Sequence, residues 1–106
     1  HSFPTRRSSD LLGGEPMHPK NIGATTLLAK RFKETYPNKS IWAWSGFLFD
    51  QGLKDKEVCK YLDVLVDGQF VEDLRNPNLK WRGSSNQRVI DVVKSLKNKK
   101  IVLYCE

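Results

Sequence analysis

The sequence has 106 residues, of which 39% are hydrophobic and 28% are charged, so it can form one domain with a single core, and its composition excludes a disordered chain or a disulfide scaffold. Its 18 lysines and arginines exceed its 12 aspartates and glutamates and give a net charge of +6, which would attract phosphates or an acidic protein surface. No stretch approaches the roughly 18 apolar residues that a membrane span needs, and we expect a cytoplasmic protein without a membrane partner.

The first eleven residues, HSFPTRRSSDL, differ from everything that follows them. They show no periodicity, and they combine clustered Ser and Arg with a Pro that fits no following helix. The run resembles the conceptual translation of a sequencing adapter, so we expect residues 1–11 to be an assembly artefact fused to a truncated reading frame. A genuine disordered tail is the alternative. The remaining domain would then cover residues 12–106.

From Leu11 onward, strand and helix signals alternate, which predicts an α/β fold with parallel strands and crossover helices. Leu11 and Leu12 are interpreted as the end of a first strand. A helix is predicted over about 20–36, with one face formed by Ile22, Thr25, Ala29, Phe32 and Tyr36. The further expected elements are a strand at 41–44, a weaker helix at 55–61, a strand at 64–66 buried on both faces, a helical turn at 71–74, a polar loop at 76–86, strands at 88–92 and 101–104, and a short helix or turn at 94–98.

Three turns that contain glycine follow three successive predicted strands, at 13–16, 44–46 and 67–68. Ligands of α/β sheets bind beyond the carboxyl ends of the strands, where such turns converge. In the first turn, Gly13 and Gly14 let the backbone approach a ligand closely, and the Glu15 carboxylate can accept an ammonium group. A glutamate at the start of an ordinary helix would give the same pattern.

Four longer segments carry a family resemblance: GGEPMHPKN at 13–21, IWAWSG at 41–46, DVLVDGQFVEDL at 63–74 and LKWRGSSNQRVIDV at 79–92. In order and spacing they resemble the radical S-adenosylmethionine superfamily, and within it the activating proteins of anaerobic ribonucleoside-triphosphate reductase. The resemblance covers essentially all of residues 12–106. It implies the C-terminal part of a partial (β/α) barrel of radical SAM type, without its first strand and helix.

The resemblance also implies a binding site for S-adenosylmethionine. Asp67 would accept hydrogen bonds from the ribose hydroxyls, although an aspartate before a glycine is also a common turn residue. The residues expected at the methionyl end of the cofactor are Gly13, Gly14, Glu15 and Pro16, followed by Ser45 and Gly46, which replace the Thr-Gly of this position. The polar loop of Arg82, Gly83, Ser84, Ser85 and Asn86 is a candidate for the cofactor edge or for docking the reductase, and by composition alone it would be a solvated loop.

The cysteines depart from the superfamily pattern. Its CxxxCxxC run would bind three irons of a 4Fe-4S cluster through thiolates, and this run is not in the sequence. Cys59 and Cys105 lie on separate predicted elements and cannot replace it. We therefore expect no metal ligands or catalytic side chains in this chain, which would be inactive by itself.

The complete protein, by resemblance, would be an oxidoreductase that generates a 5'-deoxyadenosyl radical and forms a glycyl radical on the large subunit of anaerobic ribonucleoside-triphosphate reductase. An electron donor such as flavodoxin would reduce its cluster. The activase of pyruvate formate-lyase is similar enough to remain open. The alternatives are a small basic α/β module for nucleotides or nucleic acid, and an interaction fragment without a ligand.

Two further residue types have an ordinary structural interpretation. Trp42, Trp44 and Trp81 could stack on bases, but a tryptophan on an alternating strand is more often part of the core, and no direct contact with nucleic acid is expected. His18 lacks a second ligand at metal spacing, so we expect it to mark the entry of the first complete helix.

Overall fold

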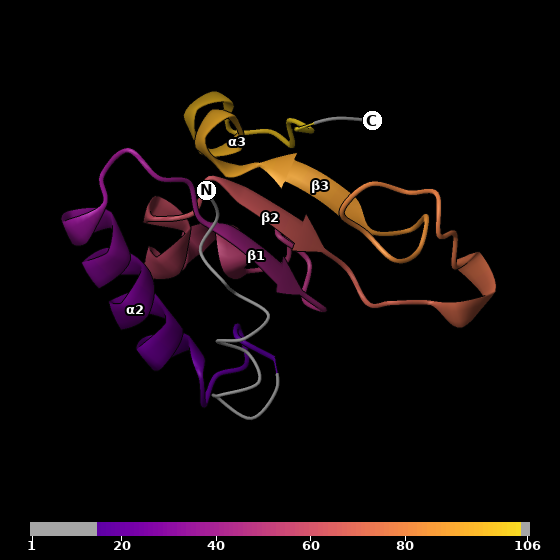
Figure 1. Cartoon of the computed structure of the whole chain (residues 1–106), viewed down its shortest axis with the longest axis horizontal. Coiled ribbons are helices and arrows are strands. Elements are labelled where there is room, and N and C mark those ends of the chain that lie inside the picture. Colours follow the sequence, from indigo (N-terminus) through magenta and orange to yellow (C-terminus); the bar gives the residue numbers. More distant parts are fainter. Residues whose placement is uncertain (1–14, 105–106) are drawn as a thin grey trace.

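The computed structural model of the chain describes residues 15–104 (Figure 1). Within them no helix combines the length and apolar character that crossing a membrane requires. The described elements are α2 (Ile22–Thr35), β1 (Trp42–Ser45), β2 (Val64–Asp67), β3 (Arg88–Asp91) and α3 (Val92–Asn98), with the short 3-10 helices η1 (Leu53–Asp55), η2 (Glu57–Lys60) and η3 (Glu72–Leu74). The predicted features outside the described residues are the strand at Leu11 and Leu12, Gly13, Gly14 and Cys105.

The three strands form a mixed sheet in the order β1-β2-β3. β1 and β2 are parallel, and Ser45 lies opposite Asp67 at their carboxyl ends. β3 runs antiparallel to β2, with Arg88 opposite Asp67, so the prediction of parallel strands throughout is wrong for β3. For β3 to run parallel to β2, the chain would have to cross back to the opposite end of the sheet, usually through a helix. Residues 68–87 instead extend beyond the end of β2 and come back to the same end (Figure 1).

The segment predicted as a strand at 101–104 is not a strand in the structure. It pairs with β3 at one isolated antiparallel bridge, Ile90 with Leu103, through hydrogen bonds from the Asp91 N–H to the Val102 carbonyl and from the Tyr104 N–H to the Val89 carbonyl, both 2.8 Å. The fold class is therefore α/β with a mixed sheet, and the radical SAM barrel stays a prediction.

Helix α2 has the apolar face that its sequence predicts. Thr25 and Ala29 are buried on it, and Ile22 and Phe32 pack against the core. Tyr36 is 51% exposed because the helix ends at Thr35, just before Pro37, and proline cannot continue a helix.

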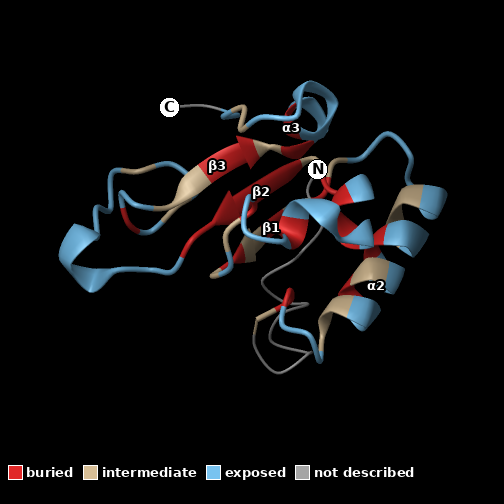
Figure 2. Ribbon diagram, turned by 180° about the vertical axis from the view of Figure 1, so that it is seen from behind, coloured by how far each residue is buried: buried red, intermediate tan, exposed pale blue. Residues whose placement is uncertain are grey.

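Apolar side chains pack on both faces of the sheet, and the ribbon of β2 is coloured as buried in Figure 2. On one face, residues from all three strands join the larger core cluster together with Ala29 of α2 and Val92 of α3. On the other face lies a smaller cluster of Val64, Val66 and Val89, with Trp42 and Trp44 packed against it. All four residues of β2 are buried, which confirms the prediction of a strand buried on both faces.

The second face carries an aromatic cluster that we define as Trp42, Trp44, Trp81 and Tyr104. The Trp42 ring centroid is 4.9 Å from that of Trp81 and 5.1 Å from that of Tyr104. Trp81 is 43% exposed and Tyr104 is 48% exposed, so the core interpretation is wrong for Trp81. This tryptophan lies outside the strands, in the segment 68–87 between β2 and β3, and its backbone has a positive φ of 67°.

Candidate functional site

The Glu15 carboxylate joins the segment before α2 to the end of β1. Its Oε1 atom accepts a hydrogen bond from the Gly46 backbone N–H at 2.6 Å, and its Oε2 atom accepts one from the Met17 N–H at 2.9 Å. Two of the three predicted turns are thereby brought together. These two hydrogen bonds hold the carboxylate in place. Because an ionised carboxylate has about four acceptor sites, it can still accept a hydrogen bond from an ammonium group.

Gly46 lies directly against the Glu15 side chain. A Cβ atom at position 46 would be in van der Waals contact with it, 3.4 Å from Glu15 Oε1 and 3.5 Å from Gln69 Cγ. The Thr25 hydroxyl donates to the Pro16 carbonyl at 2.8 Å and so ties the same segment to helix α2.

An open pocket of about 210 Å³ lies at this corner. It adjoins a second cavity of about 470 Å³, because Trp44, Phe70 and Gln87 line both. The smaller pocket is lined by Glu15, Pro16, Trp44, Ser45, Gly46, Gly68, Phe70 and Gln87, and the larger one by Trp44, Phe70, Trp81, Arg82, Gly83 and Gln87. The structure thus collects four of the predicted cofactor residues, Glu15, Pro16, Ser45 and Gly46, around one pocket.

Asp67 occupies the same end of the sheet, but its carboxylate is fully buried. Oδ2 accepts hydrogen bonds from the Phe49 N–H at 2.7 Å and from Arg88 Nη2 at 2.6 Å, and Oδ1 accepts from Arg88 Nε at 3.0 Å. The side chain does not line the pocket, so its contact with a ribose stays a prediction. In the described structure Asp67 fixes the loop after β1 and the start of β3.

Arg88 connects this buried aspartate to the surface. Its Nη2 atom also donates to Asp50 Oδ1 at 2.9 Å. The hydrogen bond with Asp67 raises the pKa of the Arg88 guanidinium above its usual range, against the opposing effect of burial. The hydrogen bond from Arg88 in turn lowers the pKa of Asp50, so both partners are charged at neutral pH.

The polar loop of residues 82–86 uses its donors and acceptors mainly on its own surroundings. Arg82 Nη1 donates to the Gln87 carbonyl at 2.7 Å. The buried Ser84 hydroxyl donates to Asn86 Oδ1 at 2.6 Å and accepts from the Val71 N–H at 3.1 Å. Arg82 and Gly83 line the larger cavity, whereas Ser84, Ser85 and Asn86 do not line either of the two cavities, so the loop's part in binding stays a prediction.

Phe70 lines both cavities and is a candidate site residue that sequence reasoning missed, whereas Gln87 was recognised only as the end of the donor-rich polar loop. The Gln87 side-chain oxygen accepts from the N–H groups of Gly83 and Ser84 at 2.8 and 3.2 Å, and its amide nitrogen donates to the Gly68 carbonyl at 3.0 Å. It therefore joins the polar loop to the turn after β2. Phe70 and Gln87 both fall inside the segments that carry the family resemblance. That resemblance is the sequence signal that could have identified Phe70 as a candidate site residue.

The part of the chain that the structure describes does not fit an iron–sulfur cluster. Cys59 is buried, and its Sγ donates to the Leu53 carbonyl at 3.1 Å. Burial, and secondarily the nearby Asp55, raises the pKa of this thiol to about 12, whereas cluster ligands are thiolates. Among residues 15–104, no three His, Cys, Asp or Glu side chains are grouped so that they could hold a metal ion.

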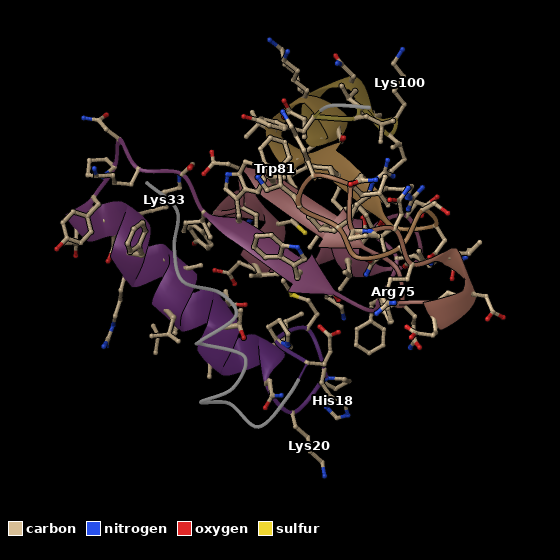
Figure 3. All side chains as sticks on the ribbon, turned by 45° about the vertical axis from the view of Figure 1, so that its right-hand side comes forward. His18, Lys20, Lys33, Arg75, Trp81 and Lys100 are labelled. Atoms are coloured by element: carbon tan, nitrogen blue, oxygen red, sulfur yellow. The ribbon has the colours of Figure 1, made fainter. Side chains whose placement is uncertain are left out.

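His18 has the structural role expected of it. Its Nδ1 atom accepts from the Lys20 N–H at 3.0 Å, and its backbone carbonyl accepts from the Ile22 N–H at the start of α2. Figure 3 shows the imidazole pointing away from the sheet.

Comparison with known proteins identifies similar chains. The sequence is 45% identical over 84 residues to the anaerobic ribonucleoside-triphosphate reductase-activating protein of Vibrio cholerae, covering 77% of this chain and 54% of the relative. It is 44% identical over 85 residues to the protein of that name from Escherichia coli K12, with coverages of 79% and 55%. The protein of the same name from Enterobacteria phage T4 is 40% identical over 79 residues, with coverages of 74% and 49%.

The chain spans about half the length of the curated relatives it matches. No solved structure matches it. A family profile described as "4Fe-4S single cluster domain" matches residues 4–90, which includes part of the run that we predict to be a non-native tail. Since this match extends over most of the sequence, the chain belongs to the family of 4Fe-4S single cluster domains.

Proposed function

We propose that this chain forms the part of a glycyl-radical activase that holds the methionyl end of S-adenosylmethionine. The observation that carries the proposal is the Glu15 carboxylate, which the Gly46 and Met17 amides fix at the edge of a pocket beyond the carboxyl end of β1. Ligands of α/β sheets bind at this end of the strands. The name that the relatives share supports the activase assignment.

The chain's own residues would position the cofactor. The Glu15 carboxylate would accept the α-ammonium group through its remaining acceptor sites, forming a charge-assisted hydrogen bond. Pro16, Ser45 and Gly46 would shape the wall around the methionyl group. Gly13 and Gly14, which lie outside the described residues, remain part of the proposed site. The bound cofactor would supply the radical chemistry, while the protein contributes orientation and exclusion of water.

The activity of the complete protein is the wider part of the proposal. It would act on the large subunit of anaerobic ribonucleoside-triphosphate reductase, in the cytoplasm, with a 4Fe-4S cluster reduced by a donor such as flavodoxin. A barrel of radical SAM type would surround the pocket. Asp67 contributes by holding the loop after β1, and its additional contact with the ribose is the part of the proposal that needs its own test.

The upstream genomic sequence provides the first test. We expect a CxxxCxxC run encoded in frame before Leu12, and its absence there would remove the activase proposal. The second test uses the protein extended by that region, reconstituted anaerobically with S-adenosylmethionine, a reductant and the reductase. The expected result is a glycyl radical signal in the electron paramagnetic resonance spectrum of the reductase. Oligonucleotide binding that weakens with salt, without cofactor binding, would instead support the basic nucleic-acid module.

A further inference from the structure

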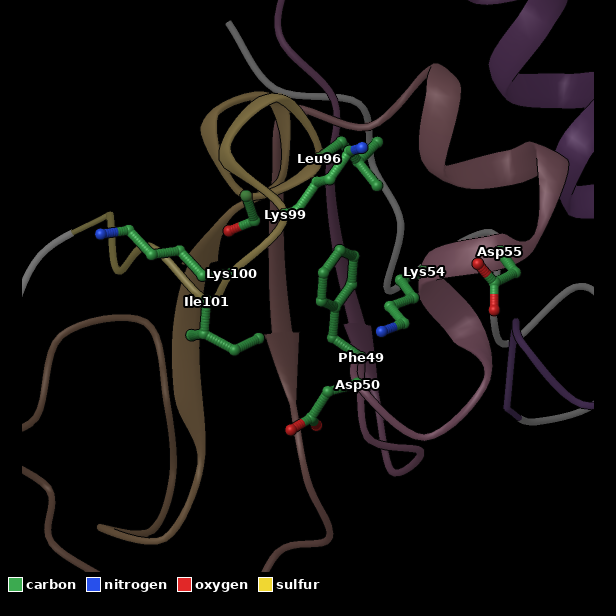
Figure 4. Close-up of a pocket in the computed structure, with 9 residues that line it drawn as sticks. Phe49, Asp50, Lys54, Asp55, Leu96, Lys99, Lys100 and Ile101 are labelled. Carbon is green, nitrogen blue, oxygen red and sulfur yellow. The ribbon is translucent and has the colours of Figure 1, made fainter.

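The larger cavity, of about 470 Å³, adjoins the smaller pocket at Glu15 through shared walls. At about 210 Å³, the smaller pocket is below the roughly 300–1,000 Å³ that a site for a ligand of this size usually has. A cofactor whose ammonium group lies at Glu15 therefore has to extend into adjoining space. The cavity between η1 and α3, shown in Figure 4, shares no lining residue with the smaller pocket, so it does not continue the site.

Aromatic side chains form much of the wall of the larger cavity. Phe70 is 51% exposed and Trp81 is 43% exposed, so both rings offer surface to a ligand. The position of Trp81 is fixed, because its carbonyl accepts a hydrogen bond from Trp44 Nε1 at 2.6 Å and its ring centroid lies 4.9 Å from that of Trp42. A preformed aromatic wall of this kind can bind a flat ring without a large ordering cost.

The Phe70 ring rests on the backbone of a glycine. A Cβ atom at position 83 would lie 3.0 Å from Phe70 Cδ1 and 3.1 Å from its Cε1, which is closer than side chains normally approach, so the ring would have to shift. The Gly83 N–H donates to the Gln87 side-chain oxygen at 2.8 Å and thereby holds this backbone in place. The glycine therefore sets where the Phe70 ring stands in the cavity.

Arg82 is the polar group of this cavity that keeps hydrogen-bond donors in reserve. Its Nη1 atom donates to the Gln87 carbonyl at 2.7 Å, whereas a guanidinium has five N–H donors. Among residues 15–104, Arg82 takes part in none of the ion pairs. The Gln87 side chain already makes three hydrogen bonds, with the N–H groups of Gly83 and Ser84 and with the Gly68 carbonyl.

Adenine matches both properties of the cavity. Its π face can stack on aromatic side chains, and its ring nitrogens accept hydrogen bonds of the kind that a guanidinium donates. The Asp67 carboxylate does not line either cavity, and it already accepts from Arg88 and from the Phe49 N–H. Recognition of the base therefore has to come from residues that line the larger cavity.

We propose that the larger cavity holds the adenosyl half of S-adenosylmethionine, with the adenine ring packed against Phe70 and Trp81. Arg82 donates a hydrogen bond to a ring nitrogen of the base. This inference rests on the proposed function, which assigns the methionyl half to the pocket at Glu15. It makes Phe70, Trp81 and Arg82 the residues that select an adenosyl group, and it assigns the polar loop to the edge of the cofactor.

The test separates the two halves of the cofactor in NMR titrations of the complete 106-residue chain. 5'-Methylthioadenosine carries the base and ribose without the ammonium group, and we expect it to shift the Trp81 indole N–H signal with saturation. L-Methionine should instead shift the Gly46 amide signal. Methylthioribose, which lacks the base, should bind at least about fivefold more weakly than methylthioadenosine. Equal affinity of these two nucleoside probes would show that the base is not recognised, and the proposal would be wrong.

Variants locate the base. Phe70→Leu and Trp81→Leu should each raise the dissociation constant of methylthioadenosine at least about fivefold, because each removes a stacking surface. Neither should change the response of Gly46 to methionine, which also shows that the variants fold. Tyr36→Leu, at an exposed tyrosine outside both cavities, is the matched control and should bind as the parent does. Parental affinity in both Leu variants would overturn the assignment.

Arg82→Gln tests the polar contact. It should raise the dissociation constant of methylthioadenosine about tenfold, since a hydrogen bond from a charged group is lost, and leave methionine binding unchanged. If it weakens methionine alone, the guanidinium holds the methionyl carboxylate and its assignment to the base is wrong.

The two proposals fail in different ways. If methionine shifts Gly46 and methylthioadenosine leaves Trp81 unmoved, the adenosyl assignment is wrong while the pocket at Glu15 stands. If methylthioadenosine shifts Trp81 and methionine leaves Gly46 unmoved, the assignment of the methionyl half is wrong, and the nucleoside site in the larger cavity is supported. Glu15→Gln should weaken methionine binding only, so a matching loss for methylthioadenosine would contradict two separate subsites.

Discussion

At the scale of single residues, Glu15 is the best-defined feature of the proposed cofactor site. Its two carboxylate oxygens each accept one backbone N–H, at 2.6 and 2.9 Å. The sequence could single out this residue as a candidate ligand of an ammonium group, because a carboxylate follows two glycines, and that role stays a prediction. Its bond to Gly46 could not, since it joins positions 31 residues apart whose proximity depends on the folded sheet.

Glu15→Gln should weaken S-adenosylmethionine binding about tenfold in the protein extended by its upstream region, because a hydrogen bond to a charged group contributes about 1.5–3 kcal/mol. The amide would also turn one N–H group toward a backbone donor. Isothermal titration calorimetry measures the change, and Glu34→Gln on the exposed side of α2 is the matched control. Unchanged affinity in Glu15→Gln would remove this residue from the cofactor site.

Because the Cys59 thiol is buried, we expect the folded chain to lose stability at high pH. The folded state raises the thiol pKa from 9.0 to about 12, so above pH 9 the unfolded chain releases a proton that the folded chain retains. The contribution is complete below pH 9 and declines as the pH rises toward 12. Thermal unfolding of the parent and of Cys59→Ala from pH 8 to 11 is the measurement. An equally steep alkaline decline in the variant would contradict the prediction.

At the scale of elements, the buried Asp67 joins three segments: the end of β2, the loop after β1 and the start of β3. The sequence placed it at the end of a strand, and the structure confirms that position. Its burial could not be predicted, because it depends on Arg88, which arrives opposite Asp67 when β3 returns antiparallel. Because β3 runs antiparallel to β2, the prediction of a crossover connection between these two strands is also wrong.

Asp67→Asn should destabilise the chain by about 2 kcal/mol, since removing one partner of a buried ion pair is costly and the exposed part of Arg88 reduces the penalty. Urea denaturation measures the free energy of unfolding. Asp73→Asn, an exposed change in η3, is the control and should have almost no effect. If the two variants unfold at the same urea concentration, the pair does not hold these segments together.

At the scale of the whole molecule, one face of the sheet packs against α2 and α3 and the other carries the aromatic cluster. Hydrophobic periodicity predicted α2, β1 and β2 because their patterns are local. The path of residues 68–87 exposes Trp81 and places Gln87 between two cavities. This path could not be predicted, because the segment contains a single helical turn, η3, and therefore has little periodicity in its sequence.

The exposed aromatic cluster predicts self-association. Contiguous apolar surface of this kind marks contact sites, and β1 pairs with β2 alone within the described residues, which leaves a strand edge open to pairing. Trp81→Lys should lower the apparent mass measured by light scattering at high concentration. Tyr36→Lys, a change at an aromatic residue outside the cluster, should leave the mass unchanged. Equal masses for the parent and Trp81→Lys would contradict the prediction.

The excursion between β2 and β3 has a practical consequence. It leaves and re-enters the sheet at the same end, and residues 76–78 at its tip are exposed. Lengthening such a tip costs little closure entropy, since each doubling of a loop adds only about 0.6 kcal/mol. We therefore expect an epitope or fluorophore inserted after Pro77 to leave the register between β2 and β3 unchanged. Such an insertion would provide a label on the same segment that contributes Gln87 to both cavities.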